Sequence, residues 1–210
     1  MSLFNLKNEL KQKEQDELME LFLKHFCINK STDDVLVAHP KVTNPGCVHI
    51  DVGLIKNDTF SYAFSFGCSI KTTIDKRYCE LYYINENDVE SSTYIHYISG
   101  FNNKDYQLRF LRNNEYVFID VKNKLNDLNN KFGGFFLYNS FDVTTKSNKI
   151  ITYIELVPAT KEELIYVENY KGSYNSLIKA FKEHLGDRRN ILDLVGLTKE
   201  EMDKISKSIR

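Results

Sequence analysis

Three alternating runs of apolar and polar residues lie within residues 47–84, whose sequence is CVHIDVGLIKNDTFSYAFSFGCSIKTTIDKRYCELYYI. The residues that share one face are Val48, Ile50, Val52 and Leu54 in the first run and Phe60, Tyr62, Phe64 and Phe66 in the second. Such period-two alternation predicts half-buried strands. Asn57-Asp58 between the runs is turn chemistry, so the two runs predict an antiparallel hairpin, and residues 78–84 predict a third strand.

The second run has large aromatic residues on one face and only small residues on the other, namely Ser61, Ala63, Ser65 and Gly67. A strand of this kind must be approached closely on its small face. A packed helix, another backbone or a bound peptide would fill that space.

The rest of the chain alternates between helical and strand patterns. An amphipathic helix is expected over residues 7–28, and strands over 35–38, 94–98, 115–121, 132–137 and 149–157, while 122–130 is a short helix or a loop. The strand over 132–137 begins with Gly133-Gly134, which we interpret as a flexible pair.

Helix signals dominate the C-terminal part. Thr160 followed by Glu163 predicts a capping box, and the apolar stripe beyond it can be interrupted at Gly172 and ends at Gly186. A helical hairpin over 191–195 and 199–209 follows, and its second helix begins at Thr198, with Glu201 three residues later. The chain therefore predicts one α+β domain over residues 1–210, with a mixed, mostly antiparallel sheet covered by N- and C-terminal helices.

Composition restricts the classes of partner. The net charge of −1 provides no bulk attraction to nucleic acid or to anionic membranes. The N-terminal residues are too charged for a signal peptide, and no apolar run approaches membrane-spanning length, so we expect a cytoplasmic protein. The cysteines, which are Cys27, Cys47, Cys68 and Cys79, form no Cys-x-x-Cys pair and are expected to be reduced and mostly buried.

His49 and Asp51 are the strongest candidates for chemistry. They project from one face of a predicted strand, two residues apart, in a spacing that suits a His–carboxylate pair orienting a base or a metal ligand. A third partner is needed, and the remaining histidines carry no ligand spacing to one another. A surface or strand-pairing role is the simpler interpretation.

Other candidate residues also lack the context that catalysis needs. Ser69 is not in a nucleophile elbow, and Cys68 and Cys79 have no adjacent helix start or basic cluster that would lower a thiol pKa. Gly133-Gly134 is not followed by the Gly-Lys-Ser/Thr of a phosphate loop, and helix capping accounts for Glu162-Glu163. We therefore assign no catalytic, cofactor-binding or metal-binding residues, and no enzyme activity is expected.

Two blocks of sequence resemble the suppressor of fused family in its compact bacterial form. The first block is His49-Ile50-Asp51-Val52, Gly67-Cys68-Ser69 and Glu80-Leu81, and the second is the segment 156–164 with Gly172 and Leu177 after it. The resemblance covers about residues 35–185, and the predicted helical hairpin over 186–210 lies beyond it. Cys68 stands where the family more often has Met, the segment 91–130 matches poorly, and Trp is absent.

This resemblance implies a function in binding another protein. Animal members of the family hold a transcription-factor peptide as an added β-strand, and many compact bacterial relatives resemble immunity proteins encoded beside toxins. The expected partner is therefore another protein, and the resemblance to immunity proteins implies a toxin domain encoded nearby. Acidic residues that could face a basic toxin are Asp33-Asp34, Glu86, Asp88, Glu90 and Glu162-Glu163. The alternative is an enzyme or a small-molecule or metal binder that uses His49 and Asp51.

Overall fold

The computed structural model describes residues 10–28, 34–38, 51–56, 61–70, 78–85, 116–118, 131–186 and 194–209. Its elements in chain order are α1 (Gln12–His25), β1 (Asp34–Ala38), β2 (Asp51–Lys56), β3 (Ser61–Phe66), the 3-10 turn η1 (Cys68–Ile70), β4 (Tyr78–Asn85), β5 (Tyr116–Phe118), β6 (Phe132–Thr144), β7 (Ile150–Thr160), α4 (Lys161–Glu168), α5 (Tyr174–Leu185) and α6 (Lys199–Ser208).

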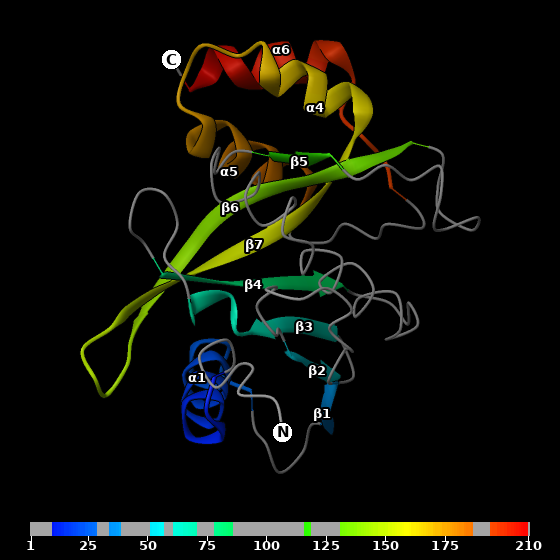
Figure 1. Cartoon of the computed structure of the whole chain (residues 1–210). Coiled ribbons are helices and arrows are strands. Elements are labelled where there is room, and N and C mark those ends of the chain that lie inside the picture. The colour runs from blue at the N-terminus through cyan, green and yellow to red at the C-terminus, as the bar shows by residue number, and fades with distance from the viewer. Residues whose placement is uncertain are drawn as a thin grey trace, which may run out of the picture.

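The strands form one seven-stranded sheet in the order β1-β2-β3-β4-β7-β6-β5 (Figure 1). Every neighbouring pair is antiparallel except β4 and β7, which run parallel with Tyr82 opposite Glu155. With α1 at one end of the sheet and α4, α5 and α6 at the other, the fold is the expected α+β domain with a mixed, mostly antiparallel sheet. The predicted hairpin is present as β2 and β3.

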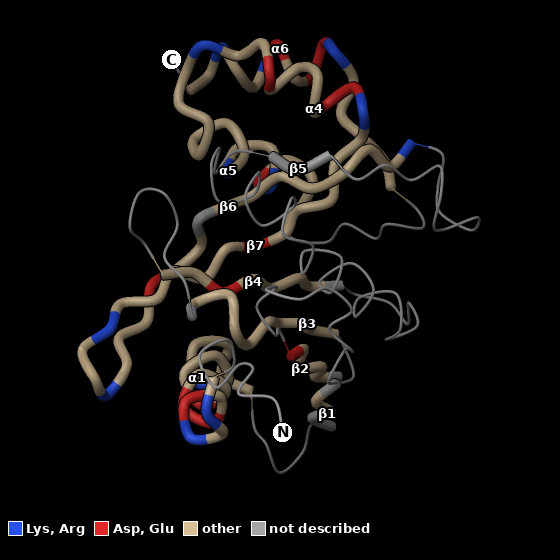
Figure 2. Tube along the Cα trace, in the orientation of Figure 1, with Lys and Arg blue, Asp and Glu red and all other residues tan. Residues whose placement is uncertain are grey.

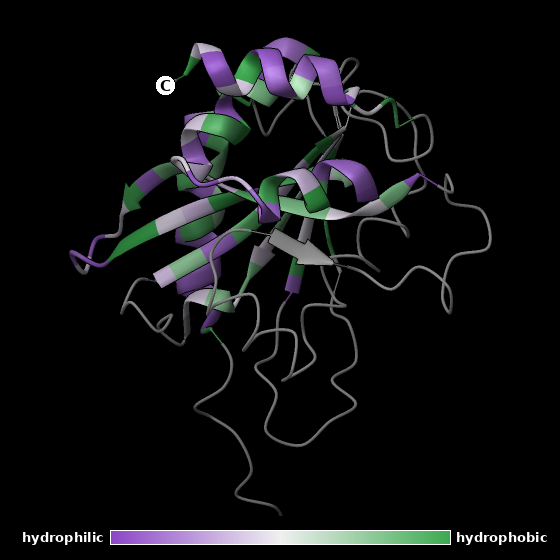
Figure 3. Ribbon diagram, turned by 90° about the horizontal axis from the view of Figure 1, so that it is seen from above, coloured by the Kyte–Doolittle hydropathy of each residue, from purple (hydrophilic) through white to green (hydrophobic). Residues whose placement is uncertain are grey.

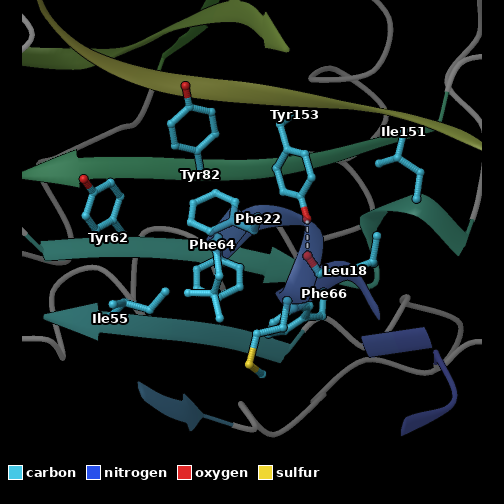
Figure 4. Close-up of a cluster of buried hydrophobic side chains, with 11 residues drawn as sticks. Leu18, Phe22, Ile55, Tyr62, Phe64, Phe66, Tyr82, Ile151 and Tyr153 are labelled. Carbon is cyan, nitrogen blue, oxygen red and sulfur yellow. Dashed lines mark hydrogen bonds between the residues drawn. The ribbon is translucent and has the colours of Figure 1, made fainter. Parts of the chain in front are cut away.

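The first hydrophobic core lies between α1 and the aromatic face of β3. Phe22 of α1 is fully buried and stacks on Phe64, with ring centroids 4.2 Å apart (Figure 4). Tyr82 of β4 and Tyr153 of β7 also contact Phe22, and the Tyr153 hydroxyl donates to the Leu18 carbonyl at 3.3 Å. The aromatic residues of the second alternating run therefore hold the N-terminal helix against the sheet.

The second core lies further along the same face of β7. Residues Tyr153, Glu155, Val157 and Ala159 alternate onto this face, because successive strand side chains point to opposite sides. Val157 and Ala159 join Phe136 of β6 and residues of the C-terminal helices, including Leu164 and Phe181, in a buried cluster. In Figure 3, hydrophobic and hydrophilic positions alternate along the helix that ends at the C-terminus, as an amphipathic helix requires.

The C-terminal helices begin where capping predicts. The Glu163 amide donates to the Thr160 hydroxyl and the Thr160 amide to the Glu163 carboxylate, at 3.2 and 2.8 Å, and Thr198 and Glu201 form a second capping box. Gly186 follows the last residue of α5 with a φ of 74°, a left-handed conformation that favours glycine.

Two expectations need correction. Leu194 and Val195 lie in an irregular segment before α6, so the described part of the predicted first helix of the C-terminal hairpin is not helical. Gly133 serves close packing instead of flexibility, because a Cβ there would lie 2.8 Å from the Lys161 backbone at the start of α4. The predicted elements over 94–98 and 122–130 lie outside the described residues.

Candidate interaction surfaces

Buried acidic residues occur singly on three strands of the sheet. Figure 2 shows strands that are largely uncharged, with isolated acidic positions on β2, β4 and β7. These include Asp51, Glu80 and Glu155, which are 3%, 0% and 5% exposed. Because an unpaired buried carboxylate is costly, the groups around each one show what it does.

The Glu80 carboxylate joins two motifs of the first sequence block that carries the family resemblance, Gly67-Cys68-Ser69 and Glu80-Leu81. Its Oε1 accepts from the amides of Gly67 and Ser69, both at 3.0 Å. Its Oε2 accepts from the Ser65 hydroxyl at 2.5 Å and from the Cys68 amide at 3.3 Å. We call these four donors and their acceptor the Glu80 cage.

The cage explains why these residue types occur at this spacing. Three successive amides around η1 converge on one anion, in a turn that concentrates N–H dipoles. Burial raises the pKa of the Glu80 carboxyl, while the bonds from Ser65, Ser69 and Gly67 act in the opposite direction. Because the Ser65 side chain of β3 is small, the Glu80 carboxylate of β4 has room beside it. The hydroxyl oxygen of Ser65 also accepts from the Leu81 amide at 2.8 Å.

Lys149 supports the cage from the turn between β6 and β7. Its ammonium donates to the Ser69 carbonyl at 2.6 Å and lies 3.9 Å from the centre of the Tyr78 ring. Burial lowers the pKa of Lys149, and the charge on Glu80 partly offsets that effect. Glu80 and Lys149 therefore both hold the loop at residues 67–69, and both oxygens of the Glu80 carboxylate accept hydrogen bonds.

Asp51 has a structural contact that the sequence did not reveal. The side-chain amide of Gln15 in α1 donates to Asp51 Oδ2 at 2.8 Å, and both residues are buried. Asp51 thereby ties β2 to the N-terminal helix. Its predicted partner, His49, lies outside the described residues. Within the described ranges, no cluster of three or more His, Cys, Asp and Glu side chains is arranged to hold a metal ion.

The described cysteines differ from one another in exposure. Cys79 is buried, Cys68 is partly exposed and Cys27 is exposed, so the expectation of mostly buried thiols is wrong for Cys27. Burial, together with the nearby Glu80 and Cys79, raises the pKa of the Cys68 thiol well above its ordinary value. A raised pKa makes Cys68 a weak nucleophile at neutral pH.

A buried ion pair separates the two cores. Lys182 of α5 pairs with Glu155 of β7, and both side chains are largely buried. The Tyr82 hydroxyl lies 3.0 Å from the same Glu155 oxygen and 2.6 Å from Ser140 Oγ. Sequence reasoning missed this cluster, although an acidic residue between the apolar residues of a buried strand was the available signal.

Glu163 is also removed from any interface with a partner. It is fully buried, and beyond its capping bond it accepts from the Leu197 amide at 2.9 Å. The expectation that Glu162-Glu163 faces a toxin is therefore wrong for Glu163, whereas Glu162 is exposed. Of the other acids proposed to face a toxin, only Asp34 lies in the described residues, where its backbone belongs to β1.

Two places among the described residues offer apolar contact to a partner, apart from the single exposed side chains of Ile150 and Val195. The edge strand β1 exposes Leu36 and Val37, which are 61% and 37% accessible. The second surface is a cavity of about 770 Å³ between α4 and α6, which we call the α4–α6 groove. Its lining includes Ile165, Tyr166 and Met202. None of the helices in the described ranges has the length and hydropathy that membrane spanning requires.

Comparison with known proteins identifies the fold. No family model and no curated protein matches the sequence. Among solved structures, the chain is similar to the crystal structure of a protein from Neisseria gonorrhoeae FA 1090 that is proposed to be a SUFU (suppressor of fused protein) homologue. The TM-score is 0.61 at 13% sequence identity, and the match covers 90% of this chain and 97% of the other. The chain thus has a suppressor-of-fused-like fold.

Proposed function

We propose that this chain is a non-enzymatic protein-interaction module of suppressor-of-fused type, and that it acts as an immunity protein that binds and neutralises a bacterial toxin. The observation that carries the proposal is the fold similarity to a suppressor of fused homologue over nearly the whole of both chains. The same family resemblance arises independently from the residues that form the Glu80 cage.

Surface chemistry supports a binding role. Exposed Leu36 and Val37 on an edge strand, and exposed Ile165 in the α4–α6 groove, offer apolar contact area in two separate places. Leu36 and Val37 are consecutive in β1 and so point to opposite faces, whereas Ile165, Tyr166 and Met202 line one groove, as is typical of interaction sites. By contrast, the carboxylates of Asp51, Glu80 and Glu155 are engaged by neighbouring groups inside the fold.

The test is neutralisation of a toxin. Candidate toxins encoded next to this chain's own gene are expressed from an inducible promoter, with and without this protein, and growth is measured. We expect growth to be restored for one toxin, with a stable complex seen by size-exclusion chromatography. Full restoration by a strongly destabilised variant, such as Glu80→Ala, would show that growth does not report binding. Failure of the native protein to restore growth or form a complex with any of these toxins would contradict the immunity role.

A further inference from the structure

The α4–α6 groove is held open by contacts between the elements that form it. The Tyr166 hydroxyl of α4 lies 3.0 Å from the Asp203 carboxylate and 2.8 Å from the Ser206 hydroxyl, both in α6. Buried Glu163 of α4 binds the Leu197 amide just before α6. The two helices are therefore fixed relative to each other without an occupant, so binding would require little ordering of the groove.

The groove combines an apolar floor with exposed charges. Ile165, Tyr166 and Met202 line it, and Ile165 is 55% exposed. Tyrosine and methionine are among the residues enriched in protein interfaces, and aromatic anchors in pockets supply much of the binding energy. A volume of about 770 Å³ lies within the usual range of ligand pockets.

The charges at the groove favour an acidic occupant. Lys171 and Lys199 line it together with Glu162, and all three are exposed. Asp203, whose carboxylate lies 3.0 Å from the hydroxyl of the groove-lining Tyr166, adds a second negative charge beside the groove, so the four groups sum to zero. Asp203 is engaged by Tyr166, whereas the two lysines present exposed ammonium groups at the rim, with which a carboxylate of an occupant can pair.

We propose that the α4–α6 groove binds a linear segment of a partner protein in which an aromatic or aliphatic side chain is flanked by Asp or Glu. The apolar residue contacts Ile165 and Met202, and the acidic residue pairs with Lys171 or Lys199. The inference deepens the proposed function, because it names the site and the chemistry of the partner segment.

The probe is a phage-displayed library of random linear peptides selected on the folded native protein. We expect enriched peptides to carry an apolar anchor beside an acidic residue. The affinity of a labelled enriched peptide is then measured by fluorescence anisotropy. Ile165→Glu should weaken binding at least about tenfold, because it removes apolar contact and repels the peptide carboxylate. Lys171→Glu and Lys199→Glu should each weaken it about two- to fivefold, and less at high salt.

Matched variants separate the groove from general effects. Ile150 at the start of β7 is 58% exposed, close to the 55% of Ile165, and it is not part of the groove, so Ile150→Glu should leave affinity within about twofold. Lys204→Glu, in α6 but outside the groove lining, is the control for charge. Circular dichroism melting curves establish that each variant folds.

Three outcomes would overturn the proposal. They are selection that enriches no peptide, enriched peptides that bind Ile165→Glu and Ile150→Glu equally, and enriched peptides that are basic. Groove-dependent self-association of the native protein in light scattering would assign the groove to a second copy instead. Toxin neutralisation that Ile165→Glu leaves intact would preserve the proposed function while removing this site from it, so the two hypotheses fail separately.

Discussion

Replacing the Glu80 carboxylate tests the most specific feature of the fold. In Glu80→Ala, the buried amides of Gly67 and Ser69, the buried Ser65 hydroxyl and the partly buried amide of Cys68 lose their acceptor. Each unsatisfied buried donor costs about 1–3 kcal/mol, so even partial relaxation leaves a loss of about 3–6 kcal/mol in the free energy of unfolding. That loss is comparable to the whole stability of many domains.

Glu80→Gln is the sharper variant because it keeps the shape of the side chain. Its carbonyl oxygen can still accept from Gly67 and Ser69, but its amino group then faces the Cys68 amide, and two donors oppose each other. We expect a loss of about 1–3 kcal/mol at pH 7, or roughly 2–12 °C in melting temperature for a chain of this size.

The assay is urea denaturation followed by circular dichroism, with thermal melting as a second measurement. Exposed Glu162→Gln is the matched control and should change stability by no more than about 0.5 kcal/mol. If Glu80→Gln proved as stable as the control variant, the Glu80 cage would not hold the loop at residues 67–69. The explanation that the Gly-Cys-Ser motif occurs because its amides bind Glu80 would then be refuted.

Three further predictions concern buried acids, two of them at Glu163 and Glu155 and the third again at Glu80. Glu163→Ala should lower the free energy of unfolding by about 2–4 kcal/mol, because the buried amides of Thr160 and Leu197 lose their acceptor. Glu201→Ala, in the more exposed capping box, should lower it by about 0.5–1 kcal/mol. Equal losses measured by urea denaturation would contradict this difference. Lys182→Met should cost about 3 kcal/mol or more, because it leaves the buried Glu155 carboxylate without its cationic partner. Adding Glu155→Gln should recover part of that loss, and a double-mutant cycle without coupling would argue against the pair. Burial raises the pKa of Glu80 in the folded state above its ordinary 4.5, so the folded state holds that proton more tightly than the unfolded state does. The stability of the native protein relative to Glu80→Gln should therefore fall as pH rises from about 4.5 through the raised pKa. Denaturation curves measured across that pH range would show the opposite slope if the pKa were lowered.

Sequence reasoning identified elements wherever a local pattern was sufficient. The alternation in β2 and β3 and the Thr-x-x-Glu signals at Thr160 and Thr198 are local, and each appears at its predicted position. The strands β6 and β7 extend beyond the predicted ranges 132–137 and 149–157, to Thr144 and Thr160. The two strands pair with each other along these added residues, and no pattern within either strand shows this pairing. The irregular segment before α6 contains Leu197, whose amide binds Glu163, and no local pattern encodes this bond between residues 34 positions apart.

The candidate surfaces were less accessible to sequence reasoning. Glu80 was noted only as part of a resemblance, because nothing local shows that its carboxylate reaches back to amides eleven to thirteen positions earlier. Asp51 was a candidate for chemistry only together with His49, and its contact with Gln15 was not predicted because it joins residues 36 positions apart. The α4–α6 groove arises from the angle between helices, which no periodicity encodes.

The contact between Tyr153 and Leu18 sets an order of events during synthesis. The two residues are 135 positions apart, and at ribosomal rates of 5–20 residues per second the second follows the first by roughly 7–27 s. For that interval α1 has been made without the β7 ring that covers Phe22. The apolar face of α1, including Leu18 and Phe22, therefore cannot complete its packing until β7 emerges, so the first core is among the last parts of the fold to close during synthesis.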